Sequence, residues 1–123
     1  RILLRCCTRR KKLKRRMDQI RVCDPLDKNT DVGAINSKEQ LQKINELLAI
    51  GKAENGEYFE SDKCTLPEKG YYCKPCFFSD VASSSTISRV EIFGPVLAIS
   101  TFRTVDEAIK KANDTPYGLA AGI

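Results

Sequence analysis

The strongest constraint on the fold comes from the last quarter of the sequence, where three kinds of local signal follow one another closely. Residues 95–102 form a short apolar and β-branched run, which is typical of a buried strand. Thr104 and Glu107 then make a capping-box pattern at the start of a helix-like segment. A turn at residues 113–118 leads into a second apolar run from Leu119. Strand, helix, turn and strand at this spacing predict a βαβ crossover and therefore an α/β fold.

Further helices and strands are predicted earlier in the chain. Ser37 and Gln40 form another capping box, and the apolar residues that follow at helical spacing predict a helix that ends at Gly51. A basic amphipathic stretch at residues 13–22 predicts a shorter helix. Extended segments are predicted at residues 53–58 and 70–78.

The composition is that of a globular protein, since 41% of the 123 residues are hydrophobic and 30% are charged. No apolar run approaches the roughly 20 residues that a membrane span needs, so we expect no membrane partner. The chain does not begin with methionine, and it ends on an apolar run at Ile123. We therefore expect residues 1–123 to be a partial domain that is truncated at both ends. The predicted location is the cytoplasm, with the mitochondrion as an alternative.

Basic residues are concentrated at the start of the chain, where nine of the 21 lysines and arginines precede Asp18, the first acidic residue. Clustered cations can bind nucleic acid or an anionic membrane surface. This segment lacks aromatic residues for base stacking and any nucleic-acid-binding motif, so we expect a solvated helix face and no nucleic-acid partner. A nucleic-acid-binding arm and a transit peptide are the alternatives.

Six cysteines and no histidine limit the chemistry of the chain. Without histidine, no Ser-His or Cys-His pair and no histidine-based zinc site is available. Cys73 and Cys76 form a CxxC pattern that can bind zinc or act as a redox pair, and Cys64 could add a third ligand. No second CxxC completes a tetrahedral site and no secretory signal is present, so we expect reduced core thiols and no metal.

Four stretches of sequence, in a fixed order, carry a family resemblance. The first is V-C-D-P-L-D at residues 22–27 with D-V-G-A-I at 31–35, and the second is G-Y-Y-C-K-P-C-F-F-S-D-V at 70–81. The third is E-I-F-G-P-V at residues 91–96, and the fourth is N-D-T-P-Y-G-L-A-A at 113–121. Together they resemble the aldehyde dehydrogenase superfamily, from the first predicted helix to the end of the chain.

This resemblance implies a partial catalytic domain with a mostly parallel sheet flanked by helices. It also implies NAD(P)-dependent oxidation of an aldehyde to a carboxylic acid by the full-length parent. In that reaction a cysteine thiolate attacks the aldehyde, a hydride passes to the nicotinamide, and a glutamate-activated water hydrolyses the thioester. The implied cofactor is NAD or NADP, the substrate is an aldehyde, and the parent is a homo-oligomer.

The resemblance implies a cofactor role for two residues of the E-I-F-G-P-V stretch. Glu91 would accept hydrogen bonds from the hydroxyls of the ribose beside the nicotinamide, because a carboxylate can accept from both hydroxyls at once. Phe93 would pack near that ribose. The alternatives are a solvated loop charge for Glu91 and core packing for Phe93.

The resemblance implies no catalytic residue within this chain. The family nucleophile lies in a G-Q-x-C segment a few residues before an arginine that opens an apolar run. Residues 1–4, R-I-L-L, resemble that arginine and run, so the nucleophile would fall just before residue 1. Cys6 and Cys7 follow this run and are assigned no role in catalysis. The general-base glutamate and the cofactor-binding turn belong to earlier segments, and residues 1–12 form an atypical basic segment. We therefore expect the chain alone to be inactive. The alternative function is a non-catalytic pseudoenzyme or a subunit-interaction fragment.

Overall fold

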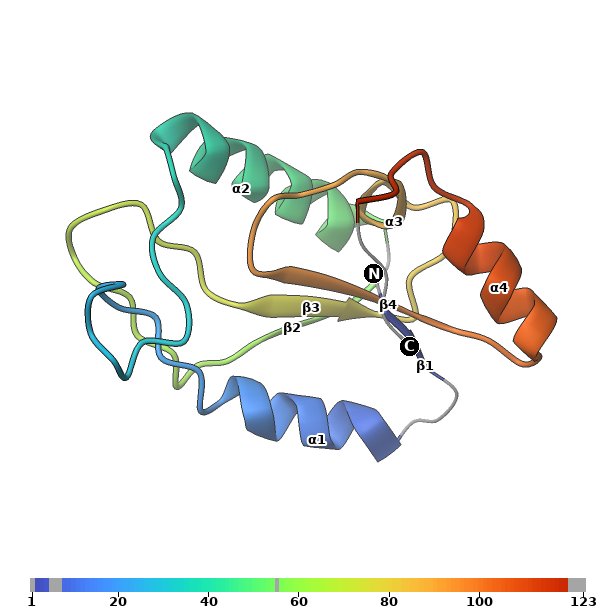
Figure 1. Ribbon diagram of the computed structural model, residues 1–123, viewed down its shortest axis with the longest axis horizontal. Coiled ribbons are helices and arrows are strands. Elements are labelled where there is room, and N and C mark those ends of the chain that lie inside the picture. The colour runs from blue at the N-terminus through green and yellow to red at the C-terminus, as the bar shows by residue number, and fades with distance from the viewer. Residues whose placement is uncertain (1, 5–7, 55, 120–123) are drawn as a thin grey trace.

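The computed structural model describes residues 2–4, 8–54 and 56–119 and has the layered architecture of an α/β protein (Figure 1). Helix α2 with the short α3 covers one face of a four-stranded sheet, and α1 covers the other, while α4 lies beside one end of the sheet. The elements are β1 (Ile2–Leu4), α1 (Thr8–Met17), α2 (Lys38–Ala53), β2 (Glu57–Glu60), β3 (Cys76–Ser79), α3 (Thr86–Arg89), β4 (Val96–Thr101) and α4 (Val105–Asn113).

The sheet is mostly parallel, and its strand order is β1-β4-β3-β2. Strand β4 lies parallel to both β1 and β3, whereas β2 is antiparallel to β3. The parallel neighbours β3 and β4 are joined through α3. The predicted α/β class is therefore confirmed, with helices on the two faces of the sheet. The predicted strand from Leu119 onward lies largely outside the described residues.

Alternation along the strands builds two hydrophobic cores, one on each face of the sheet. Cys76 and Phe78 point towards α2, and Phe77 between them points towards α1. The α2 core is formed by Ile44, Leu47, Leu48, Cys73, Cys76, Phe78, Val81, Ile87, Ile92 and Ala98. The smaller α1 core is formed by Met17, Phe77 and Ile99. Since both faces are covered, β3 is buried at every position.

Helix α2 begins where the capping box predicts but runs past its predicted end. The Ser37 side chain accepts a hydrogen bond from the backbone N–H of Gln40, which confirms the N-cap. The prediction that Gly51 ends the helix is wrong, because α2 continues to Ala53. Gly51 is buried inside the helix, where a Cβ atom would lie 2.8 Å from Ile87 Cγ2 and 2.9 Å from Phe78 Cζ. Its small size serves packing, not termination.

The predicted bounds of the first helix and the second strand are also shifted. Helix α1 covers Thr8–Met17 and not residues 13–22, because Val22 forms an isolated parallel bridge with Val32 and is therefore extended. Strand β2 covers Glu57–Glu60 and not residues 53–58, because α2 uses the chain as far as Ala53.

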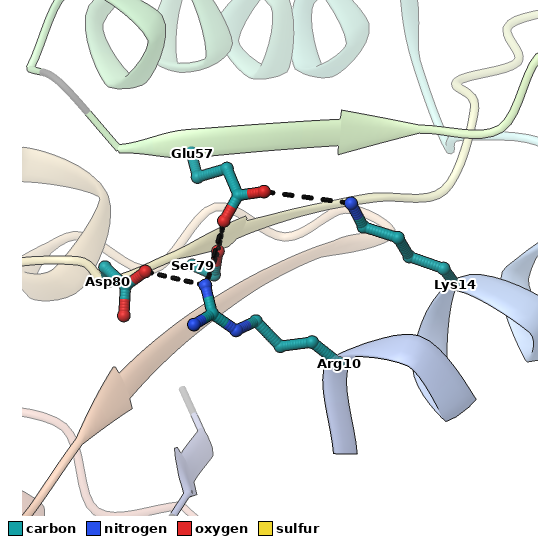
Figure 2. A network of polar contacts seen from close by, with 5 residues as sticks. All are labelled: Arg10, Lys14, Glu57, Ser79 and Asp80. Atoms are coloured by element: carbon teal, nitrogen blue, oxygen red, sulfur yellow. Dashed lines mark hydrogen bonds and ion pairs between the residues drawn. The ribbon is translucent and has the colours of Figure 1, made fainter. Parts of the chain in front are cut away.

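A polar network attaches the basic helix α1 to the sheet (Figure 2). Arg10 Nη1 lies 2.9 Å from Glu57 Oε2 in β2 and 2.7 Å from Asp80 Oδ2 after β3. Ser79 Oγ donates to the same Glu57 oxygen at 2.9 Å, and Lys14 Nζ lies 3.7 Å from the other. The Ser79 hydrogen bond, with smaller contributions from Lys14 and Arg10, lowers the pKa of Glu57. Part of the basic segment therefore has an intramolecular role.

Replacing Arg10 by alanine is expected to lower the free energy of unfolding by about 1 kcal/mol, because a partly exposed network is worth only slightly more than a single surface ion pair. Arg15 on the same helix is exposed and has no polar partner among the described residues. The matched variant Arg15→Ala should therefore change stability by less than about 0.5 kcal/mol. Urea denaturation at low and high salt checks both values. An Arg10→Ala loss that did not shrink with salt would contradict an electrostatic role.

Stability should be flat between about pH 5 and pH 8, because the chain has no histidine to titrate there. Hydrogen bonds lower the pKa of five carboxyl groups, namely Asp18, Glu39, Glu54, Glu57 and Glu107. For Glu107 the bond from Lys111 is the largest cause, and the pKa falls to about 2. A carboxyl group whose pKa is lower in the folded than in the unfolded chain stabilises the fold above the unfolded pKa of about 4.3. This stabilisation is lost as the pH falls towards 2.

At alkaline pH, stability is expected to fall as the pH rises. Burial is the largest cause of the raised pKa of Cys76, about 12 in the folded chain. The contribution of the protonated Cys76 thiol to the free energy of unfolding is present below the unfolded thiol pKa of about 8.5. It is lost as the pH rises towards 12. Urea midpoints measured from pH 2 to 10 check the acid limb and the start of the alkaline limb, and Glu107→Gln should flatten part of the acid limb. A marked slope between pH 5 and 8 would contradict it.

Among the described residues, no helix combines the length and apolar character that crossing a lipid bilayer requires.

Candidate functional site

The two residues implied to bind a cofactor lie on the loop between α3 and β4, here called the 91–94 loop. Ile92 is buried in the α2 core, whereas Glu91 on one side and Phe93 on the other are exposed. Phe93 is 69% exposed and does not belong to either core of the described residues. Glu91 has no polar partner among the described residues, so both of its carboxylate oxygens are available. The loop thus presents a carboxylate and an aromatic ring outward.

The backbone of the 91–94 loop has an uncommon conformation. Phe93 has φ of +53°, in the left-handed region that a bulky residue rarely occupies. Such conformations persist where the surroundings hold them and are concentrated at functional sites. The next residue, Gly94, lies directly over α2, where a Cβ atom would come within 2.6 Å of Ile44 Cδ1. The absence of a side chain at Gly94 therefore lets the loop approach the helix closely.

Gln40 connects the 91–94 loop to the start of α2. Its side-chain Nε2 donates to the carbonyl oxygen of Ile92 at 2.9 Å and to that of Phe93 at 3.4 Å. The predicted capping box is therefore made in one direction, because the Gln40 side chain is directed to the loop. A shallow hollow lies beside this contact, lined by Ala34, Ile35, Asn36, Gln40 and Phe93. The local sequence pattern contained no signal for this second role of Gln40.

A second set of hydrogen bonds attaches α3, the helix immediately before the loop, to the end of α2. The Glu54 carboxylate accepts hydrogen bonds from the Thr86 backbone N–H at 2.9 Å and from the Thr86 hydroxyl at 2.6 Å. These bonds lower the pKa of Glu54. A charged carboxylate at a free N–H of a helix start is favourable. Since α2 ends just before Glu54, both ends of α2 help to place the 91–94 loop.

The cysteines of the CxxC pattern lie in the α2 core and not at a surface site. Cys73 and Cys76 are buried, as is Cys64, and all three are free thiols. Burial is the largest cause of the raised pKa of each of them. A buried thiol with a raised pKa is a poor nucleophile near neutral pH. Within the described residues, no group of three or more Cys, Asp or Glu side chains is arranged to hold a metal ion.

Cys6 and Cys7 lie outside the described residues. The apolar run at the start of the chain forms β1, which pairs with β4 at one edge of the sheet.

Comparison with known proteins decides the family. The family model described as the aldehyde dehydrogenase family matches residues 8–123, nearly the whole chain. The chain belongs to the aldehyde dehydrogenase family. All four sequence motifs, helix α1 and the 91–94 loop fall within the matched range.

Individual members of the aldehyde dehydrogenase family agree closely with the chain. An aldehyde dehydrogenase of Enchytraeus buchholzi is 46% identical over 102 residues, which cover 83% of this chain and 20% of the relative. A betaine aldehyde dehydrogenase of Cereibacter sphaeroides is 39% identical over 112 residues, which cover 91% of this chain and 23% of the relative.

Solved structures of aldehyde dehydrogenases have the same fold over the matched region. The structure of aldehyde dehydrogenase from Bacillus cereus superposes with a TM-score of 0.83 at 33% identity, covering 94% of this chain and 23% of that one. A mutant betaine aldehyde dehydrogenase from Staphylococcus aureus in complex with NAD+ gives 0.86 at 28% identity, covering 96% and 25%. The chain thus spans about a fifth to a quarter of the length of the aldehyde dehydrogenases that it matches.

Proposed function

We propose that this chain supplies the cofactor-facing loop of a dehydrogenase that oxidises an aldehyde to a carboxylic acid with NAD or NADP. The observation that carries the proposal is the outward presentation of Glu91 and Phe93 on the anchored 91–94 loop, in a chain of the aldehyde dehydrogenase family. The relative from Staphylococcus aureus, which is in complex with NAD+, supports the choice of a nicotinamide cofactor.

The two side chains fit the chemistry of a nicotinamide nucleoside. The unpartnered carboxylate of Glu91 can accept one hydrogen bond from each of two neighbouring ribose hydroxyls. The exposed ring of Phe93 offers a flat apolar surface against which the sugar or the nicotinamide can pack. When bound, the cofactor accepts the hydride that leaves the oxidised carbon. The contribution of this chain is orientation, because a misplacement of about 1 Å in a reacting group can cost about a hundredfold in rate.

No residue of this chain is proposed as nucleophile or general base. The buried thiols are protonated near neutral pH because of their raised pKa values, which makes them unsuitable for attack on an aldehyde. We propose that the nucleophilic cysteine stands just before residue 1 in a longer polypeptide, and that the general-base glutamate lies in another of its segments. We further propose that this polypeptide is a homo-oligomer.

The test replaces Glu91 by glutamine in the full-length polypeptide that contains this chain. We expect the kcat/KM for the cofactor to fall about tenfold or more, because a hydrogen bond to a charged group is worth about 1.5–3 kcal/mol. Glu46→Gln is the matched control, since Glu46 is an exposed carboxylate on α2 that contacts only Gln42 among the described residues. Unchanged kinetics in Glu91→Gln would contradict the proposed role of Glu91 in cofactor binding. The chain by itself, mixed with aldehyde and NAD(P)+, should form no reduced cofactor.

A non-catalytic interaction fragment is the second candidate, and the surface around α4 favours it. The apolar side chains of this helix are not buried in the described structure, since Val105 is 68% and Ile109 is 55% exposed. Strand β1 also stands at the edge of the sheet, where unpaired backbone groups favour association with another strand. The discriminating observation is the reading frame before residue 1, because an upstream G-Q-x-C segment supports the enzyme and an upstream frame without that segment supports the fragment.

A further inference from the structure

Gln40 makes the most direct contact between α2 and the 91–94 loop. The side-chain amide has two N–H donors, and its nitrogen lies within hydrogen-bond distance of two consecutive carbonyl oxygens, those of Ile92 and Phe93. The two contacts therefore act on two successive peptide groups, the one between Ile92 and Phe93 and the one between Phe93 and Gly94. No other side-chain hydrogen bond to residues 91–94 is present within the described part of the chain.

Gln40 is itself held in place at the base of its side chain. Its backbone N–H donates to the Ser37 hydroxyl at 3.1 Å, so the residue belongs to the capped first turn of α2. The loop contact spans 52 positions in the sequence, which makes it a tertiary link and not a feature of the local turn. A capped helix end is a firm support from which to position a distant backbone segment.

The 91–94 loop needs such support. Phe93 has a positive φ, and neither Phe93 nor Glu91 gains stability from burial in this chain. The loop is also held by the buried Ile92 side chain, by the contact of Gly94 with Ile44 and by the Val96 backbone N–H, which donates to the Gly94 carbonyl oxygen at 2.7 Å. These contacts hold the loop in place, but they do not fix the direction of the carbonyl groups of Ile92 and Phe93. Only the Gln40 amide does so among the described contacts.

We propose that Gln40 is a positioning residue that holds the 91–94 loop, through the carbonyl groups of Ile92 and Phe93, in the conformation that presents Glu91 to the cofactor. This inference rests on the proposed function and adds a residue on another element to the same site. Gln40 acts here through the loop backbone, so its loss should alter how well the cofactor binds more than how fast the bound cofactor reacts.

The test compares Gln40→Met with Gln42→Met in the full-length polypeptide. Methionine keeps the length of glutamine but removes both N–H donors, so the packing at the helix start is preserved. Gln42 is the matched control, because it lies on the same helix and donates only to the exposed Glu46. One readout is hydrogen exchange of the backbone amides of residues 91–94, and the other is the KM for the cofactor together with kcat.

Gln40→Met is expected to speed exchange in the loop and to raise the KM for the cofactor, each about tenfold, because an intramolecular hydrogen bond contributes on the order of one factor of ten. Exchange within α2 and kcat should change less than about twofold, and Gln42→Met should match the parent protein. Loop exchange equal to that of the parent overturns the proposal. A normal KM in Gln40→Met also overturns it when Glu91→Gln is impaired. Normal kinetics in both variants, with faster loop exchange, refute the cofactor role of the loop itself.

Discussion

Replacing Phe78 by alanine is expected to lower the free energy of unfolding by about 3–5 kcal/mol, the range for a fully buried phenylalanine. Phe78 is completely buried at the centre of the α2 core, and its ring lies 5.0 Å from that of Tyr58. It also fills the space against Gly51 and Gly56, so its removal leaves a cavity that the helix cannot close without moving. Urea denaturation followed by circular dichroism measures the loss.

The same substitution at Phe93 is the matched control. Phe93 is 69% exposed, so Phe93→Ala should change the free energy of unfolding by less than about 0.5 kcal/mol. In the full-length polypeptide the order reverses, since Phe93→Ala should weaken cofactor binding. Equal losses of stability in the two variants would mean that Phe93 packs in the core, and the outward presentation of the 91–94 loop would then be wrong.

Replacing Gly51 by valine is expected to lower the free energy of unfolding by about 3 kcal/mol, at the upper end of the usual cost of overpacking. Even the first added carbon would approach Ile87 Cγ2 to 2.8 Å and Phe78 Cζ to 2.9 Å. Both neighbours are buried, so neither can move aside cheaply. The small gain in helix propensity over glycine does not offset this clash.

Gly118→Val is the matched control for Gly51→Val. A Cβ atom at Gly118 would meet no atom within 4 Å, so we expect a change in the free energy of unfolding of less than about 0.5 kcal/mol. Thermal or urea unfolding of the two variants checks the difference. Equal stability of Gly51→Val and the parent chain would contradict the tight contact between α2 and α3.

Local patterns predicted the elements that depend on neighbouring residues. Ser37 and Thr104 were recognised as helix caps, and in both cases the side chain accepts the expected backbone N–H three residues later. The apolar run at residues 95–102 was recognised as a strand and forms β4. Capping and strand alternation are short-range effects, so a few adjacent side chains suffice to reveal them.

Local patterns did not reveal the contacts that each element makes with distant parts of the chain. Gly51 is a reasonable helix stop by composition, but α3 and Phe78 pack so closely against it that the helix continues through it. The basic residues before Asp18 suggested a solvated face, yet Arg10 is bound to partners 47 and 70 positions away. Neither partner lies within the sequence window of a helix or a turn, so no periodicity could indicate them.

The candidate site also has one part that the sequence indicates and another that only the tertiary structure shows. The sequence by itself singled out Glu91 and Phe93 for the proposed cofactor role, because both belong to the E-I-F-G-P-V motif. Only the tertiary structure decided what holds that loop, since Gln40 and Glu54 act from the two ends of α2 across long stretches of chain. The physical reason is that a motif records the groups a ligand touches, whereas the hydrogen bonds that position them form only when the chain folds.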